Sequence, residues 1–201
     1  MTDWESQYSG DDTPWDKGAP APPLLEWLDR NPGMISGRVL VPGCGLGHDV
    51  RALASLSVDI EPVGVDLSKT AIDRAREIPS SGIESYLVAD LFRLETAHRS
   101  AYDWAWEHTC FCAIEPSQRD KYVASIHTAI KPGGQLLGVF YLDPYDDDHL
   151  PGEGPPHGTS VRELETRFAE TGLFRVEESY IPEVSYPGRE GLEQVMRMTR
   201  L

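Results

Sequence analysis

Three glycines separated by one residue each lie between an apolar run and a helical stretch, at Gly43, Gly45 and Gly47. Glycine lets the backbone turn sharply and lets a ligand approach the chain closely. Asp66 ends the next apolar run, at a distance of about 20 residues. An acid at that distance is placed to accept hydrogen bonds from both hydroxyls of a ribose. The pattern predicts a nucleoside site at the carboxyl ends of parallel strands.

The predicted nucleoside carries no phosphates. A dinucleotide loop would have its third glycine at position 48, where this chain has His48. His48 and Asp49 begin the following helix, so its N-terminus offers no evident phosphate site. S-adenosylmethionine is the common phosphate-free candidate, and its sulfonium cation suits an acidic protein. A dehydrogenase that binds NAD is the weaker alternative.

Asp90 ends a third apolar run, which is also a position where a nucleoside can be contacted. Its carboxylate would accept a hydrogen bond from an adenine amino group, or it would cap the helical segment LFRLETAH that follows. Both interpretations are open.

These residues require a framework of alternating strands and helices, and the hydrophobic pattern predicts one. Apolar strands are predicted over 38–41, 62–67, 85–90, 101–108 and 135–142, with helices over 24–29, 48–56, 68–78 and 116–130. Ser68 suits a helix N-cap and Pro116 a first helical turn, and the segment 131–134 (KPGG) is expected to end the last of these helices.

The C-terminal part continues this framework. A loop rich in proline and glycine is predicted over 143–158, followed by a capping box from Ser160 to Glu163. The segments 173–181 and 192–200 suit an antiparallel strand pair. The prediction is an α/β fold, a doubly wound, mostly parallel sheet of seven strands in one domain over residues 1–201.

Composition limits the partners. The chain of 201 residues has 18 Lys and Arg against 33 Asp and Glu, a formal net charge of −15. That charge repels nucleic acid and anionic membranes and suits a small or cationic ligand, although acidity also serves solubility alone. No apolar run approaches the roughly 20 residues of a membrane span, and the acidic start MTDWESQYSGDD differs from a signal peptide. We expect a cytoplasmic monomer.

Cysteine and acidic clusters are interpreted as structural. The odd set of Cys44, Cys110 and Cys112 predicts reduced, mostly buried thiols and no disulfide framework. The run DDDH at 146–149 resembles metal ligands, but a solvated acidic loop is favoured, and no metal site is predicted.

The segment TPWDKGAPAPPL, residues 13–24, contains four prolines close to a tryptophan. Because proline fixes the backbone angle φ, this composition suits a rigid segment that covers a site. It is also one of several stretches in which the chain resembles the thiopurine S-methyltransferase superfamily, in particular the branch with halide and thiol methyltransferases. The other matching stretches are WESQY (4–8), VLVPGCGLGHDV (39–50), VGVDLSKTAIDRA (63–75), YDWAWEHTCFCAIEPSQRDKYV (102–123), IKPGG (130–134) and GEGPPHGTS (152–160).

The resemblance spans nearly the whole chain, and WD-x-G-x-P-x-P is its most specific motif. It implies a class I, Rossmann-like methyltransferase that uses S-adenosylmethionine and releases S-adenosylhomocysteine. It also implies an N-terminal cap over the cofactor (1–33) and a substrate-side loop (143–159). The implied cofactor residues are Trp4, Tyr8 and Trp15 from the cap, Gly43 and Gly45 from the glycine loop, Asp66 at the ribose, Asp90 and Leu91 at the adenine, and His108 facing both cofactor and acceptor.

Two histidines depart from the family pattern. Position 108 resembles a site held by tyrosine in halide and thiol enzymes and by arginine in thiopurine enzymes, and His157 replaces an aromatic residue of a GGPPY-like loop. Histidine side chains titrate near pH 6.5, so they suit proton transfer. Our hypothesis is that His108, aided by His157, takes the proton of a sulfur acceptor or pairs with its anion. The alternatives are a His108 that only bonds the cofactor or a loop, and a His157 in solvent.

The predicted activity is methyl transfer to a small thiol, sulfide or halide by in-line displacement. Aromatic thiols and metalloid oxyanions are alternative acceptors. A regulator that binds S-adenosylmethionine without catalysis is the alternative outside enzymes.

Overall fold

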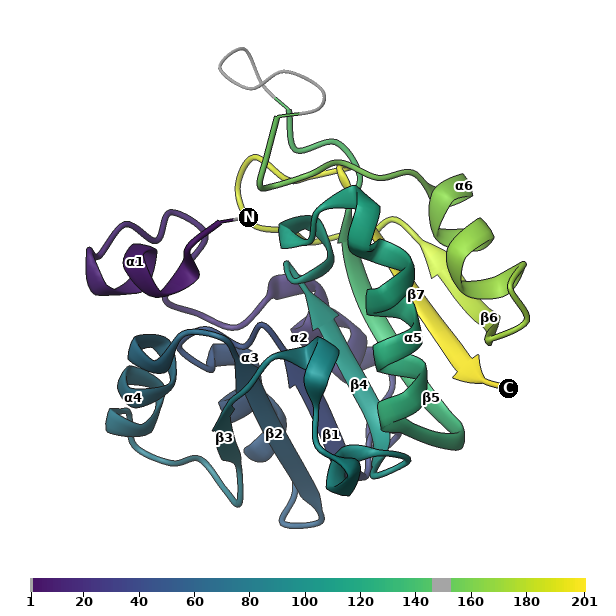
Figure 1. Ribbon diagram of the computed structural model, residues 1–201. Coiled ribbons are helices and arrows are strands. Elements are labelled where there is room, and N and C mark those ends of the chain that lie inside the picture. Colours follow the sequence, from purple (N-terminus) through teal and green to yellow (C-terminus); the bar gives the residue numbers. More distant parts are fainter. Residues whose placement is uncertain (1, 146–152) are drawn as a thin grey trace.

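The computed structural model describes residues 2–145 and 153–201. Within them, seven strands form one mixed sheet in the order β3-β2-β1-β4-β5-β7-β6 (Figure 1). Strands β1 to β5 are parallel, and β7 runs antiparallel to both β5 and β6. The predicted doubly wound sheet is therefore confirmed. The strands are β1 Gly37–Pro42, β2 Ile60–Asp66, β3 Ser85–Val88, β4 Tyr102–His108, β5 Ile130–Tyr141, β6 Phe174–Tyr180 and β7 Glu193–Arg200.

Helices lie on both faces of the sheet and at its carboxyl edge. They are α1 Trp4–Ser9, α2 Pro22–Arg30, α3 His48–Ala54, α4 Lys69–Glu77, α5 Arg119–Ala129 and α6 Val161–Leu164, which continues into a π-helical turn, Glu165–Ala169. The Ser68 side chain accepts from the Ala71 amide and so caps α4 as predicted. Ser160 likewise accepts from the Glu163 amide, but the Glu163 carboxylate bonds Arg119 and does not complete the capping box. Among the described residues, no helix is long and apolar enough to cross a membrane.

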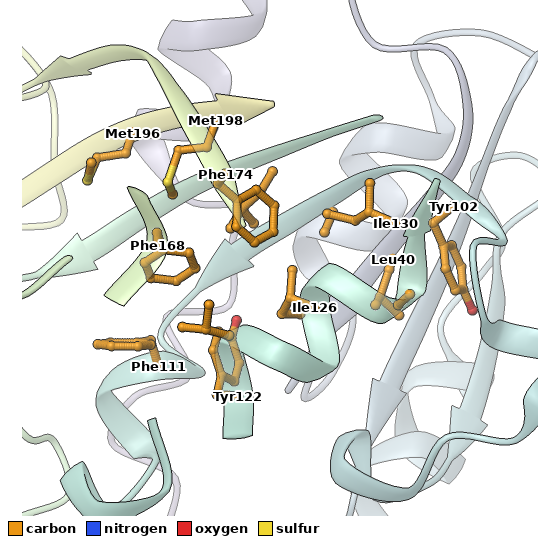
Figure 2. Packing of buried hydrophobic residues seen from close by; sticks show 14 of the residues in the cluster. Leu40, Tyr102, Phe111, Tyr122, Ile126, Ile130, Phe168, Phe174, Met196 and Met198 are labelled. Atoms are coloured by element: carbon orange, nitrogen blue, oxygen red, sulfur yellow. The ribbon is translucent and has the colours of Figure 1, made fainter. Parts of the chain in front are cut away.

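Alternation along each strand sends side chains to two separate cores. On β1, Leu40 packs on one face and its neighbours Val39 and Val41 on the other. The Leu40 face is covered by α5 and the π-helical turn, and Figure 2 shows Tyr122 and Ile126 of α5 in this cluster. The opposite face packs against α2 and α3. Burial on both faces explains why the strands are nearly continuous apolar runs.

Two predicted boundaries were wrong. Helix α5 begins at Arg119, because Pro116–Gln118 forms a separate 3-10 turn. The helix ends at Ala129, and the KPGG segment that was expected to follow it as a stop lies inside β5. Ile130 already pairs with Tyr102 on β4, and the register shifts before Gln135 pairs with Trp104. Strand pairing therefore accommodates the proline and glycines in a bulge near the start of β5.

The strand order decides where a site can form. Strands β2 and β3 lie on one side of β1, whereas β4 and β5 lie on the other. Ligands of such sheets bind at the carboxyl ends of the strands where the order reverses. Here the reversal falls between β1, which leads into the glycine loop, and β4, which ends at His108.

Candidate active site

The glycine loop after β1 has backbone conformations that favour glycine. Gly45 and Gly47 have φ of +51° and +75°. A Cβ added at Gly45 would lie 2.6 Å from the hydroxyl oxygen of Tyr8, and one at Gly47 would lie 2.5 Å from the Tyr86 ring. The loop thus lets neighbouring groups approach its backbone closely, as a ligand cradle requires.

Asp66 at the end of β2 is fastened to this loop. Its carboxylate accepts hydrogen bonds from the amides of Gly45 and Ser68, each at 2.9 Å. The residue is buried, and burial raises its pKa although these hydrogen bonds act to lower it. A carboxylate held against the backbone of a glycine loop suits the ribose contact predicted for it.

Aromatic side chains of the N-terminal segment cover the loop. Trp15 donates from Nε1 to the Tyr8 hydroxyl at 3.0 Å, and its ring meets the edge of Trp4 with centroids 5.3 Å apart. Tyr8 is buried, and this burial raises its pKa. The three cap residues predicted from the sequence therefore form one cluster.

The cap is anchored to helices α3 and α4 at several points. Glu5 accepts hydrogen bonds from the Ser68 and Thr70 hydroxyls at 2.7 and 2.6 Å, which docks α1 against α4, as Figure 1 shows. Asp16 of the WD motif lies 3.0 Å from His48 Nε2. These contacts explain why the cap motif contains charged as well as aromatic residues.

The turn after β4 is held in a strained conformation. Thr109 has φ of +61°, which is unusual for a β-branched residue and costs about 1–3 kcal/mol. The buried carboxylate of Glu107 accepts from the amides of Cys110 (3.0 Å) and Phe111 (2.7 Å), and the Tyr122 hydroxyl donates to it. Burial raises the pKa of Glu107 to about 7. Glu107 thus clamps the turn that directly follows His108.

His108 projects from the end of β4 between two aromatic rings. The ring centroids of Trp106 and Tyr186 lie 6.1 and 6.0 Å from its own. Its side chain is 10% exposed, and Nδ1 lies 3.5 Å from Oδ2 of Asp49. Its Nε2 is buried without a hydrogen-bond partner among the described residues. A buried nitrogen in this state can accept a proton from a ligand.

A cavity joins the glycine loop, the cap and the end of β4. Five predicted site residues meet there, and its lining residues are Tyr8, Trp15, Asp16, Lys17, Ala19, Val41, Pro42, Gly43, Cys44, Gly45, Leu46, His48, Asp49, His108, Thr109 and Tyr186. Asp66 and Trp4 do not line the cavity themselves. Asp66 accepts a hydrogen bond from the lining residue Gly45, and the Trp4 ring packs against the lining residue Trp15.

Asp90 and Leu91 are not among the residues that line this cavity, and Leu91 lines a separate one against α5. The Ala89 amide donates to the carbonyl of Asp66 at 2.9 Å, which places the end of β3 next to the end of β2. Asp90 accepts from the Phe92 amide at 2.8 Å and so caps the 3-10 turn η1, Leu91–Arg93. The capping interpretation of Asp90 therefore holds, and its contact with adenine is still a prediction.

His157 lies on the other side of the β4 turn and is buried, so its interpretation as a solvent histidine was wrong. Its amide donates to the Cys112 carbonyl at 2.7 Å, and Nε2 lies 3.8 Å from Glu115. The guanidinium of Arg119 holds the loop by donating to the carbonyls of His157 (2.9 Å) and Gly158 (3.0 Å). His157 is not among the residues that line the cavity with His108.

The remaining sequence predictions concern thiols and metals. Cys44, Cys110 and Cys112 are free, and burial raises the pKa of each thiol, so all three are expected to be inert. The DDDH run at 146–149 lies outside the described residues. Within the described ranges, no group of three or more potential ligands is placed to hold a metal ion.

Two site residues were missed by the sequence analysis. The sequence analysis used Asp49 only to argue against a phosphate site at the N-terminus of the helix. An acid so close to a glycine loop could also have been predicted to make a polar contact near the ligand. Tyr186 comes from the segment between β6 and β7, for which no motif indicated a role. Its hydroxyl donates to the Ala19 carbonyl of the cap at 2.6 Å, and burial and the charge of Asp49 raise its pKa to about 12.

The sequence profile of the thiopurine S-methyltransferase family matches residues 1–198. The chain belongs to this family. A probable thiol methyltransferase 2 of Arabidopsis thaliana is 34% identical over 96% of this chain and 83% of its own length. Thiocyanate methyltransferase 1 of the same plant is 32% identical over 98% and 84%.

Solved structures share the fold of this chain. One, described under "Conversion of a Disulfide Bond into a Thioacetal Group during Echinomycin Biosynthesis", has a TM-score of 0.77 at 25% identity and covers 98% of this chain and 90% of its own. A Burkholderia thailandensis N-methyltransferase with bound S-adenosylhomocysteine has a TM-score of 0.72 at 20% identity over 98% and 85%, which shows a shared fold. The protein is an S-adenosylmethionine-dependent S-methyltransferase with a class I, Rossmann-like fold.

Proposed function

We propose that the protein methylates hydrosulfide and small alkyl thiols, with halide as a further acceptor, and that His108 acts on the acceptor sulfur. The observation that carries this proposal is the buried, unpartnered Nε2 of His108 in the described structure, on a side chain that lines the cavity beside the glycine loop. The names of the thiol and thiocyanate methyltransferase relatives support a sulfur acceptor.

The residues for the cofactor come from three elements. Gly43 and Gly45 would contact the methionine part through their backbone, and Asp66 would hold the ribose. Asp90 and Leu91 would bound the adenine from the end of β3. The cap of residues 1–33 would close over the cofactor with Trp4, Tyr8 and Trp15, which already pack together above the loop.

S-adenosylmethionine supplies an electrophilic methyl group on a sulfonium sulfur. The chain must therefore hold a nucleophile in line with that methyl group and exclude water, for which positioning alone contributes on the order of 7–11 kcal/mol. His108 Nε2 would take the proton of the acceptor thiol and leave a thiolate. A thiol of pKa about 8.5 is only a few per cent ionised at pH 7, so complete ionisation gives about a 30-fold gain.

The walls of the cavity favour a small acceptor. Trp15, His108 and Tyr186 all line it, and the Tyr186 hydroxyl ties the cap to the sheet by its bond to Ala19. His157 would act from the neighbouring loop. The backbone amide of His157 is hydrogen-bonded to the carbonyl of Cys112 in the segment after β4. We propose that His157 helps to shape the acceptor side rather than receiving the proton first.

A panel of acceptors tests this function. Purified protein with S-adenosylmethionine is incubated with sulfide, methanethiol, ethanethiol, thiophenol, iodide or tellurite, and volatile products and S-adenosylhomocysteine are measured. We expect turnover of the small sulfur acceptors and its loss in His108→Gln, whereas His127→Gln on α5, which is not among the residues that line the cavity, should retain it. Cofactor binding without turnover of any sulfur or halide acceptor would refute the proposal.

The expected monomer and cytoplasmic location belong to the same proposal. Size-exclusion chromatography with light scattering should give one chain of 22.4 kDa. Fractionation of the producing cells should recover the protein with cytoplasmic markers.

A further inference from the structure

Asp49 lies where the cap, helix α3 and the end of strand β4 meet. Its Oδ1 accepts from the Ala21 amide at 2.7 Å, and its Oδ2 accepts from Trp106 Nε1 at 2.7 Å. The same Oδ2 lies 3.5 Å from Nδ1 of His108. The side chain is 14% exposed. Two donors from different elements therefore fix this carboxylate beside the histidine.

The charge of Asp49 is maintained by these contacts. Burial acts to raise its pKa, but the close His108 ring and the hydrogen bonds from Ala21 and Trp106 outweigh burial and lower it. An ionised carboxylate accepts hydrogen bonds and donates none. A lone pair on Nδ1 of His108 would face the lone pairs of this carboxylate at 3.5 Å, so the geometry favours hydrogen on Nδ1 and the lone pair of the neutral ring on Nε2.

We propose that Asp49 is the positioning residue of an Asp49–His108 pair, which holds the neutral ring with hydrogen on Nδ1 and Nε2 free to receive the proton of a thiol acceptor. This inference rests on the proposed role of His108. In the step concerned, the S–H bond of the thiol breaks, its proton moves to Nε2 and its electron pair stays on sulfur. The neutral pair of thiol and imidazole becomes thiolate and imidazolium, and Asp49 stabilises the imidazolium.

Two other titratable residues lie next to His108, and of these Glu107 points to the opposite face of the sheet, toward Tyr122 of α5. Glu107 precedes His108 on β4, and Tyr186 faces the ring from the segment between β6 and β7. Glu107 already accepts three hydrogen bonds, two from the turn and one from Tyr122 of α5, and Tyr186 donates to Ala19. Asp49 is the group whose carboxylate oxygen faces Nδ1, so it rather than these two decides the tautomer.

The arrangement also connects the base to the cap. Ala21 precedes α2, and its amide bonds the same carboxylate that faces His108. When the cap segment is in place, this bond holds the carboxylate toward the ring. Cap position and the tautomer of His108 are therefore coupled through one side chain.

Nitrogen NMR of the histidine rings tests the inference in the protein itself, without turnover. The His108 signals are assigned by their loss in His108→Gln and followed at a pH at which the ring is neutral. We expect the wild-type ring to carry hydrogen on Nδ1 and the ring in Asp49→Asn to move toward hydrogen on Nε2. A wild-type ring with hydrogen on Nε2 overturns the inference, whether or not the variant folds.

Asp103→Asn is the matched control. Asp103 also accepts from a backbone amide, that of Arg38 at 2.9 Å, and from the Lys131 ammonium, but it lies at the opposite end of β4. The same chemical change there should leave the His108 signals and turnover unchanged. Equal changes in both variants would show a general effect of the substitution on the sheet and overturn the role of Asp49.

Turnover of two thiols of similar size separates this inference from the proposed function. Ethanethiol is largely protonated at neutral pH, whereas 2,2,2-trifluoroethanethiol is more acidic because fluorine withdraws electrons. In Asp49→Asn we expect kcat/KM for ethanethiol to fall at least 10-fold and the loss to be several-fold smaller for the fluorinated thiol. An equal loss for both thiols would overturn the role of Asp49 in proton transfer. If the tautomer changes as expected but wild-type and His108→Gln proteins turn over both thiols alike, the pairing holds and the proposed function of His108 fails.

Discussion

Replacement of Glu107 by glutamine should remove a specific pH dependence of stability. The folded protein raises the pKa of this carboxyl from an ordinary 4.5 to about 7, because it is buried behind the turn that follows His108. A carboxyl with a raised pKa binds more protons in the folded than in the unfolded chain between these two values. The free energy of unfolding therefore falls as the pH rises through this window.

The magnitude follows from the difference between the two pKa values. At about 1.36 kcal/mol per pH unit, the shift from 4.5 to about 7 corresponds to about 3 kcal/mol, of which about 2–3 kcal/mol is lost between pH 5 and pH 8. Glutamine retains an oxygen for the amides of Cys110 and Phe111 and carries no charge. Glutamine does not titrate, so the variant should lack this loss. The free energy of unfolding of Glu107→Gln minus that of wild type should therefore increase by about 2–3 kcal/mol from pH 5 to pH 8.

Urea unfolding followed by fluorescence of the five tryptophans, at several pH values from 5 to 8, measures this difference. Glu84→Gln is the control. Hydrogen bonds from the amides of Ser81 and Gly82 outweigh the effect of burial and lower the pKa of Glu84, so its contribution is complete above pH 5. The difference in free energy of unfolding between Glu84→Gln and wild type should therefore not change between pH 5 and pH 8. An equally flat difference for Glu107→Gln would refute the burial argument.

Three further changes test the cap, the glycine loop and the acceptor-side loop. Trp15→Ala should weaken S-adenosylmethionine binding about 10-fold in calorimetry while far-UV circular dichroism is unchanged, because an aromatic contact contributes roughly 1 kcal/mol beyond its buried area. Gly47→Ala should lower the free energy of unfolding in urea by at least about 1–2 kcal/mol, since φ is +75° and the new Cβ would meet Tyr86. Arg119→Met should cost about 3 kcal/mol in the same assay, because it leaves the Glu163 carboxylate and two carbonyls without their buried donor. Retained cofactor affinity, or unfolding curves that match wild type, would contradict the respective arguments.

The sequence predicted much of the fold because its signals are local. Apolar runs, the Ser68 cap and the glycine loop depend on neighbours within a few residues, and the structure has each at its predicted place. The start of α5 was wrong because Pro116–Gln118 forms a separate 3-10 turn, and the interpretation of KPGG was wrong because pairing with β4 decided where β5 starts. A long-range contact cannot be deduced from local pattern.

The site shows the same division. The sequence by itself determined a glycine loop, an acid at the spacing expected for a ribose contact, an aromatic cluster and a family, because each is carried by adjacent or regularly spaced residues. Only the tertiary structure decided that His108 stands beside Asp49 and Tyr186, which come from α3 and from the segment before β7. The physical reason is the reversal of strand order between β1 and β4. It brings the ends of distant segments together, so that one carboxylate can meet the cap, a tryptophan and the histidine.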